Sequence, residues 1–168
     1  GAEHPEGLGA AGATEAEVSR RIGRLRLFNI AMGVVHAVQG AAILVLATSF
    51  TLPIVTHALT GPPGSPSETI TLLDLRIAWA VAAFLFISAI AHLVIASPMT
   101  FPNYQRLLLN GRNYYRWVEY SLSASLMAVL IALLSGISDA AALIAIFGVN
   151  AAMIFFGLLQ ERYERPGG

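Results

Sequence analysis

Four long apolar runs constrain the fold of this 168-residue chain more than any other feature. They extend over about residues 27–50, 76–97, 115–135 and 140–160. As a helix rising about 1.5 Å per residue, each run is long enough to cross roughly 30 Å of hydrocarbon. Hydrophobic residues make up 56% of the chain and charged residues 12%, which lies outside the composition of soluble globular domains. The sequence therefore predicts an all-α membrane protein with four transmembrane helices.

The segments around these runs predict one structured loop and two tails. Residues 51–75 carry the turn sequence GPPGSP between stretches rich in Thr, Val, Ile and Leu, which predicts a β-hairpin between the first two helices. Residues 1–22 are rich in Gly, Ala and Glu without a periodic apolar face, so we expect a flexible tail. Residues 165–168 form a second tail, which leaves 23–164 as the transmembrane domain, with a loop between the second and third helices.

Arginine is distributed unevenly between the two ends of the predicted helices. Arg76 lies at the hairpin end, and every other arginine lies at the opposite end. These are Arg20, Arg21, Arg24, Arg26, Arg106, Arg112, Arg116, Arg162 and Arg165. Because basic residues concentrate on the cytoplasmic side of a membrane, both termini are predicted in the cytoplasm and the hairpin outside. We expect a multi-pass protein of the cell membrane.

One carboxylate, Glu119, lies inside the third apolar run, within the sequence RWVEYSLSAS. An ionisable side chain in hydrocarbon is costly, and it persists when it faces a protein interior and has polar partners. Ser123 follows four residues later on the same face, and Tyr120 is adjacent. The sequence therefore predicts a buried counterion or proton acceptor. The alternative is an interfacial carboxylate that is paired with Arg112 or Arg116 and wetted by water.

Other polar residues in the apolar runs are candidates for the same site. His36 and His92 fall in the cytoplasmic halves of the first and second runs, and two imidazoles near a carboxylate favour a proton-holding network. Ser88 shares the face of His92, and Asn150 in the fourth run predicts a hydrogen bond between helices. The first run has a stripe of polar and small residues expected to face other helices: Asn29, Gly33, His36, Gln39 and Gly40. The absence of cysteine excludes thiolate metal sites, and no pattern predicts a metal centre or an enzyme.

Several of these segments resemble the heliorhodopsin family. RWVEYSLSAS resembles that family's counterion motif, and GVVHAVQ, LTGPPGSP, SAIAHLV and IAIFGVNAAMIFFGLLQERY match it in order and spacing. The resemblance covers about residues 24–164. It implies a retinal-binding, light-sensing membrane photoreceptor that signals rather than pumps ions and that forms homodimers. It also implies a cytoplasmic N-terminus and an extracellular hairpin, as the arginine distribution does.

Residue by residue, the resemblance implies that Glu119 is the counterion of a protonated retinal Schiff base. The other implied site residues form a proton network on the cytoplasmic side and part of the chromophore pocket. They are Ser88, Tyr120, Ser123, His36 and His92 in the network, and Asn150 in the pocket.

The chain departs from that family in one chemical respect. Heliorhodopsins have seven helices and attach retinal to a lysine in the last, whereas this chain has four apolar runs and no lysine. Arginine cannot replace the primary amine of a Schiff base because it stays protonated. We therefore expect the N-terminal portion of a longer protein, or a truncated form, with the missing C-terminal helices as its partner. Two other classes remain open: a four-helix haem protein for electron transfer with His36 and His92 as axial ligands, and a membrane scaffold without chemistry.

Overall fold

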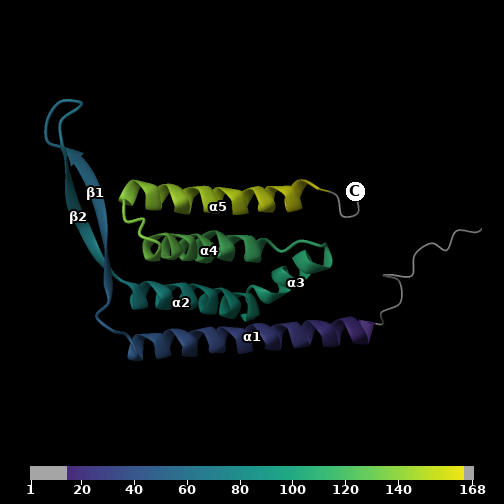
Figure 1. Ribbon diagram of the computed structural model, residues 1–168. Coiled ribbons are helices and arrows are strands. Elements are labelled where there is room, and N and C mark those ends of the chain that lie inside the picture. Colours follow the sequence, from purple (N-terminus) through teal and green to yellow (C-terminus); the bar gives the residue numbers. More distant parts are fainter. Residues whose placement is uncertain (1–14, 165–168) are drawn as a thin grey trace, which may run out of the picture.

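The computed structural model describes residues 15–164. The elements in chain order are α1 (Glu15–Val45), β1 (Thr51–Leu59), β2 (Ser67–Arg76), α2 (Ile77–Ala96), α3 (Phe101–Leu109), α4 (Tyr114–Leu134) and α5 (Ala140–Tyr163). Helices α1, α2, α4 and α5 form one row in which each contacts the next (Figure 1). The hairpin of β1 and β2 lies beyond one set of helix ends, and α3 lies near the opposite ends of the helices (Figure 1).

Four helices of the described chain are long and apolar enough to cross a membrane, which confirms the predicted number of spans. These segments are Glu17–Val45, Ile77–Ala96, Tyr114–Leu134 and Ala140–Tyr163. Little of their surface is covered by the chain itself: in α5, Leu143 and Ile154 are the buried residues. The apolar side chains therefore point mostly outward, as expected for helices that face lipid or further helices.

Helix α1 begins earlier than the sequence analysis predicted. It starts at Glu15 rather than near residue 27, so residues 15–22 of the predicted flexible tail are helical. The remaining predicted tail residues, 1–14 and 165–168, lie outside the described part of the chain. Glu, Ala and Arg in this stretch favour helix, and Arg21 pairs with Glu17 one turn away at 2.9 Å. Apolar length marks where a helix enters hydrocarbon, and it does not mark where the helix begins.

The segment predicted as a loop between the second and third spans contains the short helix α3. Pro102 lies in its first turn, where the missing N–H is tolerated. Tyr104 is buried and meets Tyr115 of α4 edge-on, with ring centroids 5.7 Å apart. Arg26 of α1 donates from Nε to the carbonyl of Ala96 at 2.9 Å, which ties α1 to the end of α2 beside α3. This helix thus closes the end of the bundle that carries most of the arginines.

Strands β1 and β2 form the predicted antiparallel hairpin, with Thr51 opposite Arg76 and Leu59 opposite Ser67. Gly64 in the connecting turn has φ +99°, a conformation that side-chain-bearing residues rarely adopt. Midway along β1, the backbone N–H of Val55 donates to the carbonyl of Ser138 at 2.9 Å. The hairpin is therefore anchored to the connection between α4 and α5.

Gly33 and Gly40 allow α1 to approach α2 closely, in agreement with the predicted small-residue stripe. A Cβ at Gly33 would lie 3.0 Å from the Leu93 side chain and 3.3 Å from the Ala89 carbonyl oxygen. A Cβ at Gly40 would lie 3.0 Å from the Phe86 ring. Small residues permit such contacts between membrane helices. His36 lies between these two glycines, so the close contact brings its ring to α2.

Candidate functional site

Glu119 of α4 is held by a hydroxyl group from α2. Ser88 Oγ donates a hydrogen bond to Glu119 Oε1 at 2.7 Å, a short distance typical of a hydroxyl bound to a carboxylate. Ser88 itself is 8% exposed. Across residues 17–164, the ion pair that the structure forms is Arg21–Glu17, and neither Arg112 nor Arg116 pairs with Glu119. The predicted alternative pairing with Arg112 or Arg116 is therefore absent from the described residues, and Glu119 itself is half-buried.

The hydroxyls expected beside Glu119 on its own helix do not bond to it. Ser123 is 3% exposed and shares the general face of Glu119, but no hydrogen bond joins the two side chains in the described chain. Tyr120 is 48% exposed. Neighbouring residues are about 100° apart around a helix, so Tyr120 leaves the face that meets α2. The structure thus brings Ser88 to the acid and leaves Tyr120 outside the contact.

His36 of α1 and His92 of α2 stack on one another, with ring centroids 5.6 Å apart and planes 14° apart. The two rings therefore lie at the same level of the α1–α2 pair, and their place in the cytoplasmic half of a membrane stays a prediction. His92 Nδ1 lies 2.9 Å from Asn29 Oδ1, so Nδ1 carries the proton in this bond. His36 Nδ1 is buried and has no hydrogen-bond partner within the described residues. Asn29 was not among the predicted site residues, although its spacing of seven from His36 places both on one face.

The stacked histidines are unsuited to the haem alternative. Two axial histidines approach the iron end-on from opposite faces of a porphyrin. Here the imidazole rings lie almost parallel against each other, with 5.6 Å between centroids, which leaves no place for a macrocycle between them. The structure also groups no three His, Cys, Asp or Glu side chains for a metal ion among the residues that it describes.

Asn150 of α5 forms the interhelical hydrogen bond that was predicted for it. Its Nδ2 donates to Ser125 Oγ of α4 at 3.0 Å, and Ser125 is fully buried at 0% exposure. The amide is thereby satisfied within the α4–α5 interface. Its implied place in a chromophore pocket stays a prediction.

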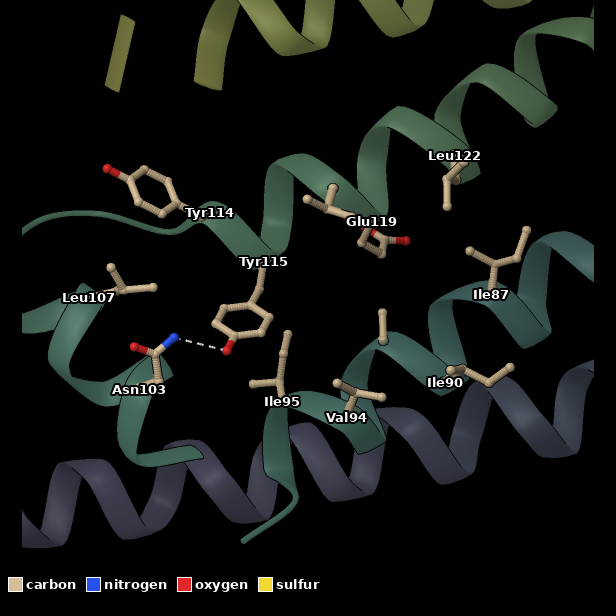
Figure 2. Close-up of a pocket in the computed structure, with 12 residues that line it drawn as sticks. Ile87, Ile90, Val94, Ile95, Asn103, Leu107, Tyr114, Tyr115, Glu119 and Leu122 are labelled. Carbon is tan, nitrogen blue, oxygen red and sulfur yellow. Dashed lines mark hydrogen bonds between the residues drawn. The ribbon is translucent and has the colours of Figure 1, made fainter. Parts of the chain in front are cut away.

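An apolar cavity of about 530 Å³ lies beside Glu119, between α2, α3 and α4. Figure 2 shows its lining, with Ile87 and Ile90 from α2 facing Leu122 from α4. At the end near α3, Asn103 Nδ2 donates to Tyr115 Oη at 3.1 Å. Glu119 is the charged member of this lining. A charge beside an apolar volume interacts more strongly with a cation than it would in water.

A second carboxylate, Glu161 of α5, binds the first turn of α4 and was not predicted. Its two oxygens accept hydrogen bonds from the backbone N–H of Asn113 and from Trp117 Nε1. Gly157, one turn earlier on α5, packs against the Trp117 ring. Two sequence features could have indicated this contact. Gly157 and Glu161 are four residues apart and so share a helix face, and a buried tryptophan N–H needs an acceptor.

The fold and this site define a multi-pass helical membrane protein with an acid held between spans near one end of the bundle. The heliorhodopsin family profile matches residues 25–168. The chain therefore belongs to the heliorhodopsin family. A comparison with curated proteins found no match.

Proposed function

We propose that this chain is the counterion-bearing part of a light-sensing retinal receptor. The observation that carries the proposal is the Glu119 carboxylate, held by Ser88 within a membrane span and without a cationic partner among residues 17–164. An unpaired carboxylate in hydrocarbon is unfavourable, and a cation brought to it would relieve that penalty. The positive end of bound retinal is such a cation, and family membership supports this identification.

This chain supplies a counterion for the positive charge of retinal, and it supplies no lysine to which retinal could be attached. The 168 residues contain no lysine, so the chain has no amine side chain to form the covalent bond. We propose that further helices of the same protein supply that amine. When bound, retinal supplies light absorption and a positive charge. The described residues supply the opposing negative charge at Glu119 and the hydroxyl of Ser88 that orients it.

We further propose signalling rather than ion pumping, because the titratable side chains of the four spans gather toward the α3 end. Glu119, His36 and His92 belong to this set, together with the Tyr, Arg and Glu residues at the same ends of α4 and α5. Four segments make up the halves nearer the hairpin, and they contain no Asp, Glu, His, Tyr or Arg: residues 37–45, 77–87, 121–134 and 140–150. Proton transport across a membrane uses chains of such groups. In this part of the protein, a proton that leaves the acid has acceptors toward one side.

The orientation and assembly of the chain are part of the same proposal. Arginines of α1, α3 and the start of α4 support a cytoplasmic N-terminus and an extracellular hairpin. The uncovered apolar face of α5 is compatible with a homodimer. Reporter fusions at the hairpin turn and at the N-terminus test the orientation, and light scattering of the detergent-solubilised protein tests the dimer.

Reconstitution of the complete protein with retinal tests the proposed function. We expect a visible absorption band that hydroxylamine bleaches. Glu119→Gln should move this band to longer wavelength, because a negative charge near the cation stabilises the ground state more than the excited state. Glu164→Gln, an exposed change at the C-cap of α5, is the matched control and should leave the band in place. A wild-type protein without a visible band would refute the proposal, and a band that shifts on chemical reduction would favour haem.

A further inference from the structure

Helix α4 presents polar side chains to two different neighbours. Glu119 meets Ser88 on α2. Trp117 and Ser125, eight residues apart and so close to one face, meet α5 instead. Trp117 and Glu119 are two residues apart, which separates them by about 200° around the helix. Any rotation of α4 that loosens its contact with α5 therefore also moves Glu119 relative to Ser88.

Glu161 holds the first turn of α4 at two points. One carboxylate oxygen accepts the backbone N–H of Asn113, the N-cap residue of α4, and the other accepts Trp117 Nε1. The first N–H groups of a helix have no partner within the helix, so an acceptor from a neighbouring helix satisfies one of them. A negative charge at a helix N-terminus is also favourable. We call Glu161, Asn113 and Trp117 the Glu161 latch.

The Trp117 ring is confined on its other sides as well. A Cβ at Gly157 would lie 2.6 Å from Cζ3 of the ring, so the ring rests directly on the α5 backbone at a position that excludes larger residues. The Arg116 guanidinium lies 4.8 Å from the ring centroid. Two turns further along α4, the Ser125–Asn150 hydrogen bond provides a second fixed point on the same side. Both contacts lie between α4 and α5, and a rotation of α4 about its axis would disturb them together.

We propose that Glu161 is a positioning residue: the Glu161 latch fixes the rotation of α4 at which Glu119 meets Ser88. This inference rests on the proposed function in that it concerns the same counterion. Glu161 acts from the opposite side of α4 and makes no hydrogen bond to Glu119 in the described chain. Its effect on Glu119 is transmitted through the helix as a change of geometry.

The test uses the complete protein with Glu161→Gln and Trp117→Phe. The second change removes the indole N–H donor together with part of the ring and keeps the Glu161 carboxylate, so it is an independent variant if the first impairs folding. Glu164→Gln at the C-cap of the same helix is the matched control, because its carboxylate is exposed. The first readout is the infrared carboxylate band of Glu119 in retinal-free protein. It is obtained by subtracting the spectrum of the same protein with Glu119→Gln. The second is the absorption maximum after retinal is added.

Both latch variants should shift the infrared band in the direction that Ser88→Ala shifts it, and the control should not. In a Ser88→Ala background, the shift caused by Glu161→Gln should fall by about half or more, because coupled residues act non-additively. An undiminished shift in that background would mean that Glu161 acts as a remote charge, and no shift in either variant would mean that it has no positioning role. Both outcomes overturn the inference. If the wild-type protein forms no pigment, the proposed function fails, and the retinal-free infrared measurement still decides the role of the latch.

Discussion

The contact between Gly157 and Trp117 predicts a large effect from the smallest possible substitution. In Gly157→Ala, the new methyl group would lie 2.6 Å and 2.7 Å from Cζ3 and Cη2 of the Trp117 ring. Carbon atoms in contact prefer separations of about 3.5–4.0 Å. Because the position of the added Cβ is fixed by the α5 backbone, the ring must move. Its Nε1–H then leaves Glu161.

The magnitude follows from three contributions. Overpacking of this kind destabilises by about 1–3 kcal/mol. A lost hydrogen bond to a charged acceptor adds about 1.5–3 kcal/mol. Replacement of glycine by alanine inside a helix returns up to about 1 kcal/mol. When the ring moves, it escapes the overpacking and loses the hydrogen bond, so the first two costs do not add in full. We therefore expect Gly157→Ala to lower the free energy of unfolding by about 2–4 kcal/mol.

Gly148, on the same helix, is the matched control. A Cβ there would meet nothing within 4 Å, so Gly148→Ala should stabilise α5 through helix propensity alone. The assay is unfolding in mixed micelles with increasing dodecyl sulfate, followed by circular dichroism and tryptophan fluorescence. Equal midpoints for the two variants, or a Gly157→Ala protein as stable as the wild type, would refute the packing described for Trp117.

Three further predictions use the same unfolding assay. Ser125→Ala removes the acceptor of the Asn150 amide and should lower stability by about 0.6–1.7 kcal/mol, the range of hydrogen bonds between membrane helices; Asn150→Leu in that background should restore part of the loss. Gly33→Ala places a carbon 3.0 Å from the Leu93 side chain; overpacking costs about 1–3 kcal/mol and helix propensity returns up to about 1 kcal/mol, so the variant should be less stable than the wild type by up to about 2 kcal/mol. Burial raises the pKa of Tyr104 above its usual value of 10.0, so the folded state favours the neutral phenol. The contribution of Tyr104 to the free energy of unfolding is present below pH 10.0 and is lost as the pH rises through the raised pKa. Tyr104→Phe should lack this loss of stability at alkaline pH.

The spans and the hairpin were predictable because each depends on a local pattern. A run of apolar residues long enough for the bilayer specifies a helix regardless of its neighbours. GPPGSP between β-rich flanks specifies a turn within a few residues. Glu119 was recognisable for the same reason, since a single acid in such a run is unusual wherever it occurs.

The partners of these residues were less predictable, because they depend on how the helices are rotated against each other. Hydroxyls on the helix of Glu119 were expected to bind it, whereas the bond comes from Ser88 on α2. Sequence spacing identifies a face and not the helix that it meets. Glu161 was missed because QERYE reads as a polar helix end, and only the approach of Trp117 gives its half-buried carboxylate a hydrogen-bond partner on another helix. Helix α3 was missed because nine residues are too few for a clear period.

The contacts that orient these spans are polar or involve glycine, and this has a physical cause. Lipid chains are as apolar as leucine, so burying leucine between helices yields little driving force in a membrane. Close backbone approach and hydrogen bonds must then select the rotation of each helix. The α1–α2 pair uses Gly33 against Leu93, and the α4–α5 pair uses Gly157 and Glu161 against Trp117. Polar and glycine substitutions should consequently alter the geometry around Glu119 more than aliphatic exchanges on the outward faces do, even where the latter change more atoms.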